Sequence, residues 1–238
     1  MHRIKVSSIL VDVIKKDIKN IHLAVYPPSG RVRIAVPLKT SDESVRLFII
    51  SKISWIKKQK TKFENTERQS ERNYVTRESH YFQGKRYLLN VIEHDGPAKV
   101  EIRNKKFIDI YVKKGSTISR RERLLTEWYR KQLKEQVPVL LKKWEKVVGV
   151  KTEDWGIKQM KTKWGTCNIR AKRIWLNLEL IKKPEHFLEY IIVHELVHLL
   201  ERNHNERFIS YMDNFLPPWR SYKKQLNQFI LPHSSWTY

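Results

Sequence analysis

Alternating apolar and polar residues dominate the chain up to about residue 112 and predict a β-rich N-terminal region. Val32, Ile34 and Val36, for example, are separated by arginine and alanine and follow a Pro27–Gly30 turn. Asn104 and Lys105 have the composition of a second hairpin turn. No internal repeat is visible in the sequence. The expected strands are residues 3–13, 20–26, 32–36, 81–92, 98–103 and 106–112.

The hydrophobic period then changes to that of helices. Ser41 can cap a first helix that reaches about Lys62. Ser119 and Glu122 form a capping box for a long helix, in which Pro138 should cause a kink or a break. Two short strands are expected at 157–160 and 173–178. Further helices are expected at residues 187–200, 205–214 and 218–230.

The helix expected at 187–200 carries the pattern His194-Glu195-Leu196-Val197-His198. At about 100° and 1.5 Å per residue, the two histidines lie about 40° and 6 Å apart on one helix face. This spacing allows both imidazoles to bind one metal ion, and Glu195 would lie beside the ion. A chance match on a buried helix would instead leave the histidines hydrogen-bonded in the core. The apolar helix and a third histidine nearby favour a metal site.

His204 is the best candidate for a third ligand, but a continuous helix would turn it away from His198. We therefore expect the helix to end near Asn203, since asparagine tolerates the left-handed conformation that terminates helices. Asp213 and His233 are more distant alternatives. Three protein ligands would leave one position open, which is typical of catalytic zinc and not of structural zinc. Glu195 would then accept a proton from water held by the metal.

Composition adds three observations, on cysteine content, on apolar segments and on charge. Cys167 is the only cysteine, so the 238-residue chain has no internal disulfide, which favours a reducing cytoplasm. No run of 18 apolar residues predicts a membrane span, and the start lacks the apolar block of a signal peptide. Residues 1–150 carry 34 Lys and Arg against 16 Asp and Glu, a net +18 of the total +23. This excess predicts a polyanionic partner, and non-specific contact with DNA is the simplest hypothesis.

Several motifs in order along the chain resemble those of the YgjP-like metallopeptidases, relatives of the SprT-like zincins. The motifs are Lys163-Trp164-Gly165-Thr166-Cys167, Ile174-Trp175-Leu176-Asn177, Pro184, Tyr190 to His198, Asn203-His204 and Phe208. Weaker similarity extends upstream, through the Gly30-Arg31-Val32 hairpin and Trp128-Tyr129. Thr166 departs from the serine that is more usual in the family. The resemblance implies a zincin-like fold, zinc bound by His194, His198 and His204, and Glu195 as catalytic base.

Together these observations predict an α+β protein with two regions. Residues 1–115 would form a basic, β-rich N-terminal region with a helix, and residues 116–238 a zincin-like metallopeptidase domain containing the HExxH helix. The expected function is hydrolysis of protein or peptide substrates by one zinc ion per chain, in a DNA-associated context. The alternative is a nucleic-acid-associated binding module whose zinc site is mainly structural.

Overall fold

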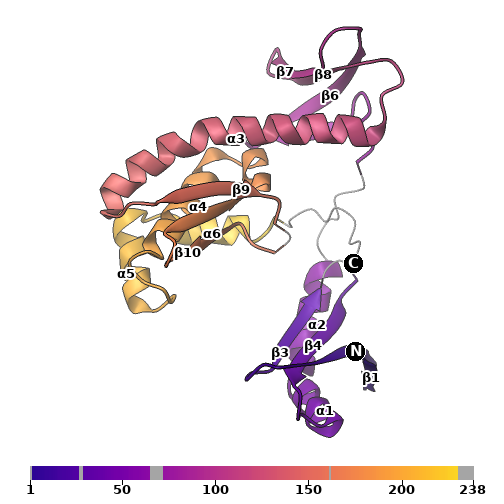
Figure 1. The fold of residues 1–238 in the computed structure, drawn as a ribbon, viewed down its shortest axis with the longest axis vertical. Helices are drawn as coiled ribbons and strands as arrows, with labels where there is room; N and C mark the ends of the chain where they lie inside the picture. The colour runs from indigo at the N-terminus through magenta and orange to yellow at the C-terminus, as the bar shows by residue number, and fades with distance from the viewer. Residues whose placement is uncertain (1, 27–28, 65–71, 161, 230–238) are drawn as a thin grey trace. The chain divides into compact units, whose positions relative to one another are not determined.

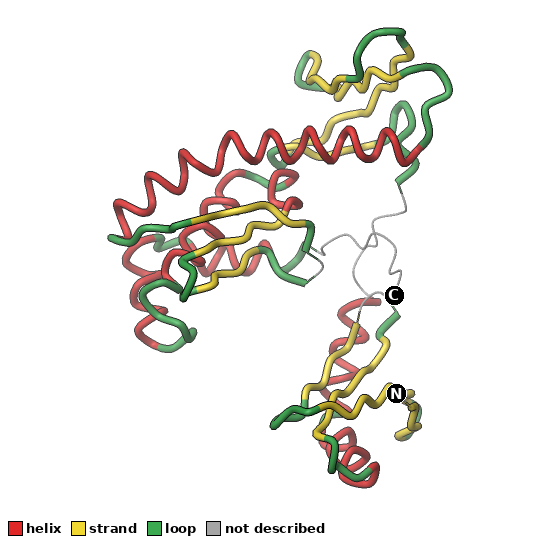
Figure 2. Tube along the Cα trace, in the orientation of Figure 1, coloured by secondary structure: helices red, strands yellow, loops and turns green. Residues whose placement is uncertain are grey.

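The computed structural model describes residues 2–26, 29–64, 72–160 and 162–229. The described residues form two compact units, residues 2–64 and residues 72–229, each with a hydrophobic core of its own. Helices and strands are mixed in the chain, with three separate small sheets among the described residues (Figure 2). The fold is therefore mixed α and β, as expected.

The smaller unit is a four-stranded sheet with two helices on one face. Its strands have the order β1-β2-β4-β3, in which β2 and β4 are parallel and the two outer pairs are antiparallel. Val45, Ile49 and Ile56 of the helices are fully buried against the valines and isoleucines of the strands. The elements are β1 (His2–Val6), β2 (Ile9–Lys16), β3 (His22–Tyr26), β4 (Arg31–Pro37), α1 (Asp42–Ser51) and α2 (Ile53–Glu64).

Two sequence predictions for this unit were too coarse. The expected strand 3–13 is a hairpin, because Ser7 has a positive φ of 56° and reverses the chain between β1 and β2. The expected helix is two helices that meet at Lys52, whose backbone (φ −108°, ψ 5°) departs from the helical region. The Ser41 cap is confirmed, since its side chain accepts a hydrogen bond from the Ser44 amide.

The second sheet repeats the arrangement of the first. Its order is β5-β6-β8-β7, with β6 and β8 parallel and both outer pairs antiparallel, and a helix follows its last strand. The expected strand 81–92 is again a hairpin, which turns at Gln83 and Gly84, both with positive φ. The predicted turn at Asn104–Lys105 is present. The strands are β5 (Ser79–Phe82), β6 (Lys85–Glu93), β7 (Lys99–Arg103) and β8 (Phe107–Val112).

The long helix α3 (Ile118–Val148) connects this sheet to the rest of the larger unit (Figure 1). Its cap is Thr117 and not Ser119, because the Thr117 side chain accepts the hydrogen bond from the Arg120 amide. The helix continues through Pro138, which is exposed, so of the predicted kink or break the break does not occur. Gly149 ends the helix in the left-handed conformation. At 1.5 Å per residue, its 31 residues span about 46 Å.

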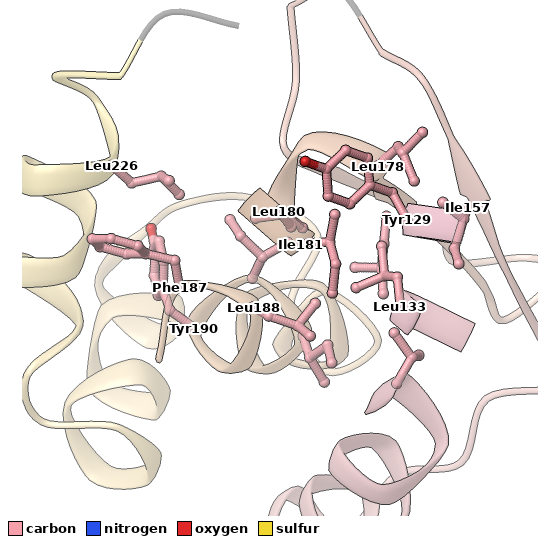
Figure 3. Close-up of a cluster of buried hydrophobic side chains, with 14 of the residues drawn as sticks. Tyr129, Leu133, Ile157, Leu178, Leu180, Ile181, Phe187, Leu188, Tyr190 and Leu226 are labelled. Carbon is pink, nitrogen blue, oxygen red and sulfur yellow. The ribbon is translucent and has the colours of Figure 1, made fainter. Parts of the chain in front are cut away.

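The remaining elements surround the helix α4 (Glu185–Val197). This helix is apolar on nearly all sides and packs against α3 and against the elements that follow it in the chain. Figure 3 shows side chains of α3, α6 and the 3₁₀ helix η1 gathered around Phe187, Leu188 and Tyr190 of α4. The other elements are β9 (Asp154–Lys158), β10 (Gly165–Asn168), β11 (Arg173–Asn177), η1 (Leu178–Lys182), α5 (Glu206–Phe215) and α6 (Trp219–Leu226).

The two compact units do not coincide with the expected regions 1–115 and 116–238. The strands β5 to β8 belong with the larger unit, because Leu89, Ile108 and Ile110 share a core with Leu125 and Tyr129 of α3. Because the hydrophobic effect holds these shared apolar side chains together, the boundary between the two compact units lies before residue 72 and not near residue 115. Within the described residues, no helix has the length and apolar character needed to cross a membrane.

Candidate metal centre and active site

Helix α4 positions the first two residues of the HExxH pattern. His194 and Glu195 lie in its last turn, and His198 caps its end with φ −64° and ψ −18°. Because these angles are still helical, the His194 and His198 rings remain on one face, with their centroids 4.9 Å apart. The helix is held rigidly, since its buried residues include Ile192, Val193 and Leu196 at zero exposure.

The chain leaves α4 earlier than predicted. Tight turns at residues 199–201, in which Leu199 and Leu200 donate to carbonyls three residues back, end the helix just after His198. Asn203 is not among the residues with positive φ, so the expected left-handed exit at Asn203 is wrong. The Asn203 amide instead donates to the Glu201 carboxylate at 3.1 Å, and Asn205 caps α5. These local hydrogen bonds return the chain toward α4 at His204.

The three histidines converge. One ring nitrogen from each of His194, His198 and His204 lies within 4.8 Å of the others. The Nε2 atoms of His194 and His204 are 3.0 Å apart. Phe208 of α5 is buried beneath the cluster, with its ring centroid 4.6 to 5.0 Å from all three imidazoles. The side chain of Phe208 thus packs against all three histidine rings.

The protonation of these imidazoles suits a metal ion. Burial lowers the pKa of His194 to about 3, and the neighbouring His198 and His204 add to this shift. Burial also lowers the pKa of His198 and of His204. His198 Nδ1 lies 3.1 Å from the Glu201 carbonyl oxygen, to which it can donate, and this leaves Nε2 free as an acceptor. Three neutral imidazoles at this spacing fit a zinc ion, which prefers nitrogen ligands.

The two alternative ligands do not join the cluster. Asp213 accepts hydrogen bonds from the Trp219 indole at 2.8 Å and from the Arg220 guanidinium. The Arg220 hydrogen bond is the main cause of the lowered pKa of Asp213. His233 lies outside the described residues.

Glu195 is the buried acid of the site, with 4% of its surface exposed. Burial raises its pKa to about 8, and the Lys163 side chain opposes this shift. A divalent cation at the three imidazoles would favour the ionised carboxylate, because an opposite charge nearby lowers the pKa of an acid. The pKa of Glu195 therefore depends on two opposing effects: burial raises it, and a cation bound at the histidines would lower it.

Gly165 of β10 covers Glu195. A methyl group on its Cα would lie 2.6 Å from Glu195 Oε1 and 2.7 Å from Ile191 Cγ2. Only glycine therefore allows this close approach of the strand to the carboxylate. The strands predicted at 157–160 and 173–178 would flank residues 163–167, whereas Gly165 and Cys167 themselves belong to the edge strand of a sheet with the order β10-β11-β9.

Asn177 holds the segment that precedes β10. Its amide is fully buried and donates to the carbonyl oxygens of Met160, at 2.8 Å, and Lys163, at 2.7 Å. Its backbone amide donates to the Trp164 carbonyl at 2.9 Å. The roles of Asn177, Gly165 and Phe208 were not predicted from the sequence, in which they appear only as parts of motifs. The signal for Asn177 was a polar residue at the end of an apolar strand.

Cys167 is half-buried in β10. Burial raises the pKa of its thiol to about 11, and the nearby Glu195 carboxylate adds to the shift. Its sulfur is not one of the three atoms that converge at the histidine cluster. The thiol therefore lacks the surroundings that favour a metal-binding thiolate.

The basic region 1–150, for which DNA contact was proposed, is divided between the two compact units. Lys57 and Lys58 are exposed on α2 of the smaller unit, and the side chain of Lys62 is outside the described residues. Lys131 and Lys134 are exposed on α3 of the larger unit, whereas Arg130 donates to the Ile157 carbonyl at 2.6 Å.

Comparison with known proteins gives a family and two similar structures. The sequence model described as "YgjP-like, metallopeptidase domain" matches residues 19–229. The metallopeptidase zymogen of Pyrococcus abyssi abylysin is 18% identical with a TM-score of 0.38, and the match covers 42% of this chain and all of that one. The metallopeptidase zymogen of Methanocaldococcus jannaschii jannalysin is 22% identical with a TM-score of 0.36, covering 39% of this chain and 95% of that one. None of the curated proteins matches the chain. Because the family match spans most of the residues, the chain belongs to the YgjP-like metallopeptidase family.

Proposed function

We propose that this metallopeptidase uses zinc, held by His194, His198 and His204, with Glu195 as general base in a zincin-type site. The observation that carries the proposal is the convergence of ring nitrogens from three histidines within 4.8 Å, at the end of the helix that holds Glu195. Three nitrogen ligands leave a position open, as in catalytic zinc sites.

The bound metal would supply a Lewis acid that polarises the scissile carbonyl and lowers the pKa of water. Glu195 would accept a proton from the attacking water at a carboxylate oxygen and later donate it to the nitrogen of the leaving amine. Its burial, with 4% of its surface exposed, would limit the access of competing bulk water to the carboxylate. Gly165 and Ile191 would hold the carboxylate in one position through the contacts described above.

The position of β10 supports a peptide as the substrate. β10 is an edge strand, bonded to β11 on one side, and its Gly165 lies directly over Glu195. An extended peptide could pair with the free edge of such a strand through main-chain hydrogen bonds. Pairing there would bring a peptide bond of the substrate next to Glu195. The pairing would depend on main-chain atoms and not on the identity of the substrate side chains.

The test combines metal content with hydrolysis of casein and short peptides. Wild type should contain one zinc per chain. Glu195→Gln should keep the metal and lose about 10²- to 10⁴-fold in kcat, the range that general acid–base catalysis contributes. Glu206→Gln, an exposed acid in the first turn of α5, is the matched control and should leave both unchanged. His204→Ala should lose metal, whereas His22→Ala on the exposed end of β3 should not.

Two outcomes would contradict the proposal. Equal rates for wild type and Glu195→Gln on a cleaved substrate would exclude the general-base role. Stoichiometric zinc without hydrolysis of any peptide would favour the alternative, a binding module with a structural metal site.

A further inference from the structure

The open face of the N-terminal sheet is strongly basic. In β4, Val32, Ile34 and Val36 point to the core, so Arg31, Arg33 and Ala35 point to the opposite face. The strand registers place residues of β1 and β2 beside these arginines. The five cationic residues on this face are Arg3, Lys5, Lys16, Arg31 and Arg33.

One acid lies among these cations, and it is already neutralised. Asp12 is 3% exposed and accepts hydrogen bonds from Arg3 Nε, at 2.7 Å, and from Arg31 Nε. The two guanidinium groups cover the carboxylate, and the Arg3 side chain remains 61% exposed. In the strand registers, Arg33 lies opposite Asp12 and Lys5 lies opposite Leu10. Arg33 and Lys5 therefore add positive charge to the face, beyond that of the two arginines paired with Asp12.

The second sheet provides an internal comparison, because it has the same strand order and directions. Its open face also has a buried acid, Asp109, which accepts from Arg103 Nε at 2.6 Å. There, however, Lys99 is paired with Glu101 at 2.9 Å, so the cations and acids nearly balance. The excess of positive charge is therefore a property of the first sheet and not of this arrangement of strands.

The geometry points to a nucleic-acid-binding surface: the open face of β1, β2 and β4 binds the phosphate backbone of duplex nucleic acid, without reading its sequence. Five cationic side chains on one face match a polyanion with closely spaced phosphates. Of the described residues on this face, only Tyr26 carries a phenyl, phenol or indole ring. Single-strand binding generally requires several aromatic rings for stacking, so the composition favours a duplex. This inference does not depend on the peptidase proposal.

The experiment measures binding of the full chain to a short labelled duplex DNA at salt concentrations between about 50 and 200 mM. The test variant is Lys5→Gln/Arg33→Gln, which keeps both partners of Asp12 and so avoids an unpaired buried carboxylate. The matched control is Lys131→Gln/Lys134→Gln, which removes the same charge from the exposed side of α3. Thermal unfolding should be the same for all three proteins.

The test variant should lower the log–log salt slope by about 1.8, because each phosphate contact contributes about 0.9. The ratio of the wild-type binding constant to that of the variant should then be about 12-fold smaller at 200 mM than at 50 mM salt. Unchanged slopes, or a larger loss in the α3 control, would place binding elsewhere. Tighter binding to a single strand would show that the partner is single-stranded nucleic acid and not a duplex. Equal binding to polyglutamate or to phosphatidylserine vesicles would show that the surface does not select duplex nucleic acid. No binding at low salt would overturn the inference altogether.

Discussion

At the scale of single residues, the site depends on a position without a side chain. Gly165→Ala would place a methyl group 2.6 Å from Glu195 Oε1 and 2.7 Å from Ile191 Cγ2, so Glu195 must move. A displacement near 1 Å costs about 100-fold in rate, and we expect kcat/KM for peptide hydrolysis to fall by about this factor. Zinc content should remain, because the histidines are not touched.

Thr166→Ala serves as the control for that prediction, since alternation along β10 places its side chain on the other face of the strand. Wild-type kcat/KM in Gly165→Ala would show that the close approach of β10 does not constrain Glu195.

The buried amide of Asn177 leads to a prediction about the stability of the protein. In Asn177→Asp, a buried carboxylate would face the carbonyl oxygens of Met160 and Lys163, to which the amide now donates. We expect the free energy of unfolding to fall by about 3 kcal/mol, as for a buried polar group that loses its partners. Urea titration measures the change.

Asn168→Asp is the matched control. Asn168 is exposed, and its Oδ1 accepts from the Ala171 amide at 3.1 Å, a bond that a carboxylate retains. Its effect should be within about 0.5 kcal/mol. Equal losses in the two variants would mean that the Asn177 clamp contributes nothing specific.

At the scale of elements, β2 illustrates how a sheet accommodates a buried charge. Burial alone would raise the pKa of Asp12, but hydrogen bonds from Arg3 and Arg31 outweigh it and hold the pKa below its usual value. A depressed pKa in the folded state contributes stability above the unfolded pKa of about 3.9. That contribution is lost as the pH falls through the lower, folded pKa.

We therefore expect the smaller unit to lose stability on acidification between about pH 5 and pH 3, and Asp12→Asn to reduce this pH dependence. The unfolding of β1 to β4 can be followed by the backbone amide NMR signals in urea at both pH values. Asp17→Asn, in the turn between β2 and β3, is the control. A difference between wild type and Asp12→Asn that does not change with pH would contradict the assigned ion pairs.

At the scale of the whole molecule, the histidine cluster and the basic sheet lie in separate compact units. A ligand stabilises only the folded state that binds it, by about 4 kcal/mol at 1,000 times its Kd. If zinc binds at the three histidines, as proposed, its removal should accelerate amide exchange of the core of residues 72–229 by up to about 1,000-fold, with residues 2–64 unaffected.

Hydrogen exchange with mass spectrometry on the full chain, with and without a chelator, measures both regions in one sample. The His204→Ala protein should show little response to the chelator. An equal response of peptides from both units would mean that they unfold together.

The family of this protein and the candidate residues of its site could be read from the sequence alone, because the relevant signals are local. The spacing of His194, Glu195 and His198 on an apolar helix needs only helix geometry, and the motifs identified the family that the sequence match confirms. Turns such as Asn104–Lys105 and the cap at Ser41 were also readable, since they depend on neighbouring residues. The roles of the site residues stay predictions.

Tertiary structure decided which residues share a core and what surrounds the site. The strands β5 to β8 joined the larger unit because their apolar faces are covered by α3, a contact between segments that hydrophobic periodicity does not encode. Gly165 over Glu195, the Asn177 clamp and Phe208 beneath the histidines all join residues more than ten positions apart or on different elements. The shared strand order of the two sheets appeared only in the pairing, since different side chains can satisfy the same hydrogen-bonded backbone.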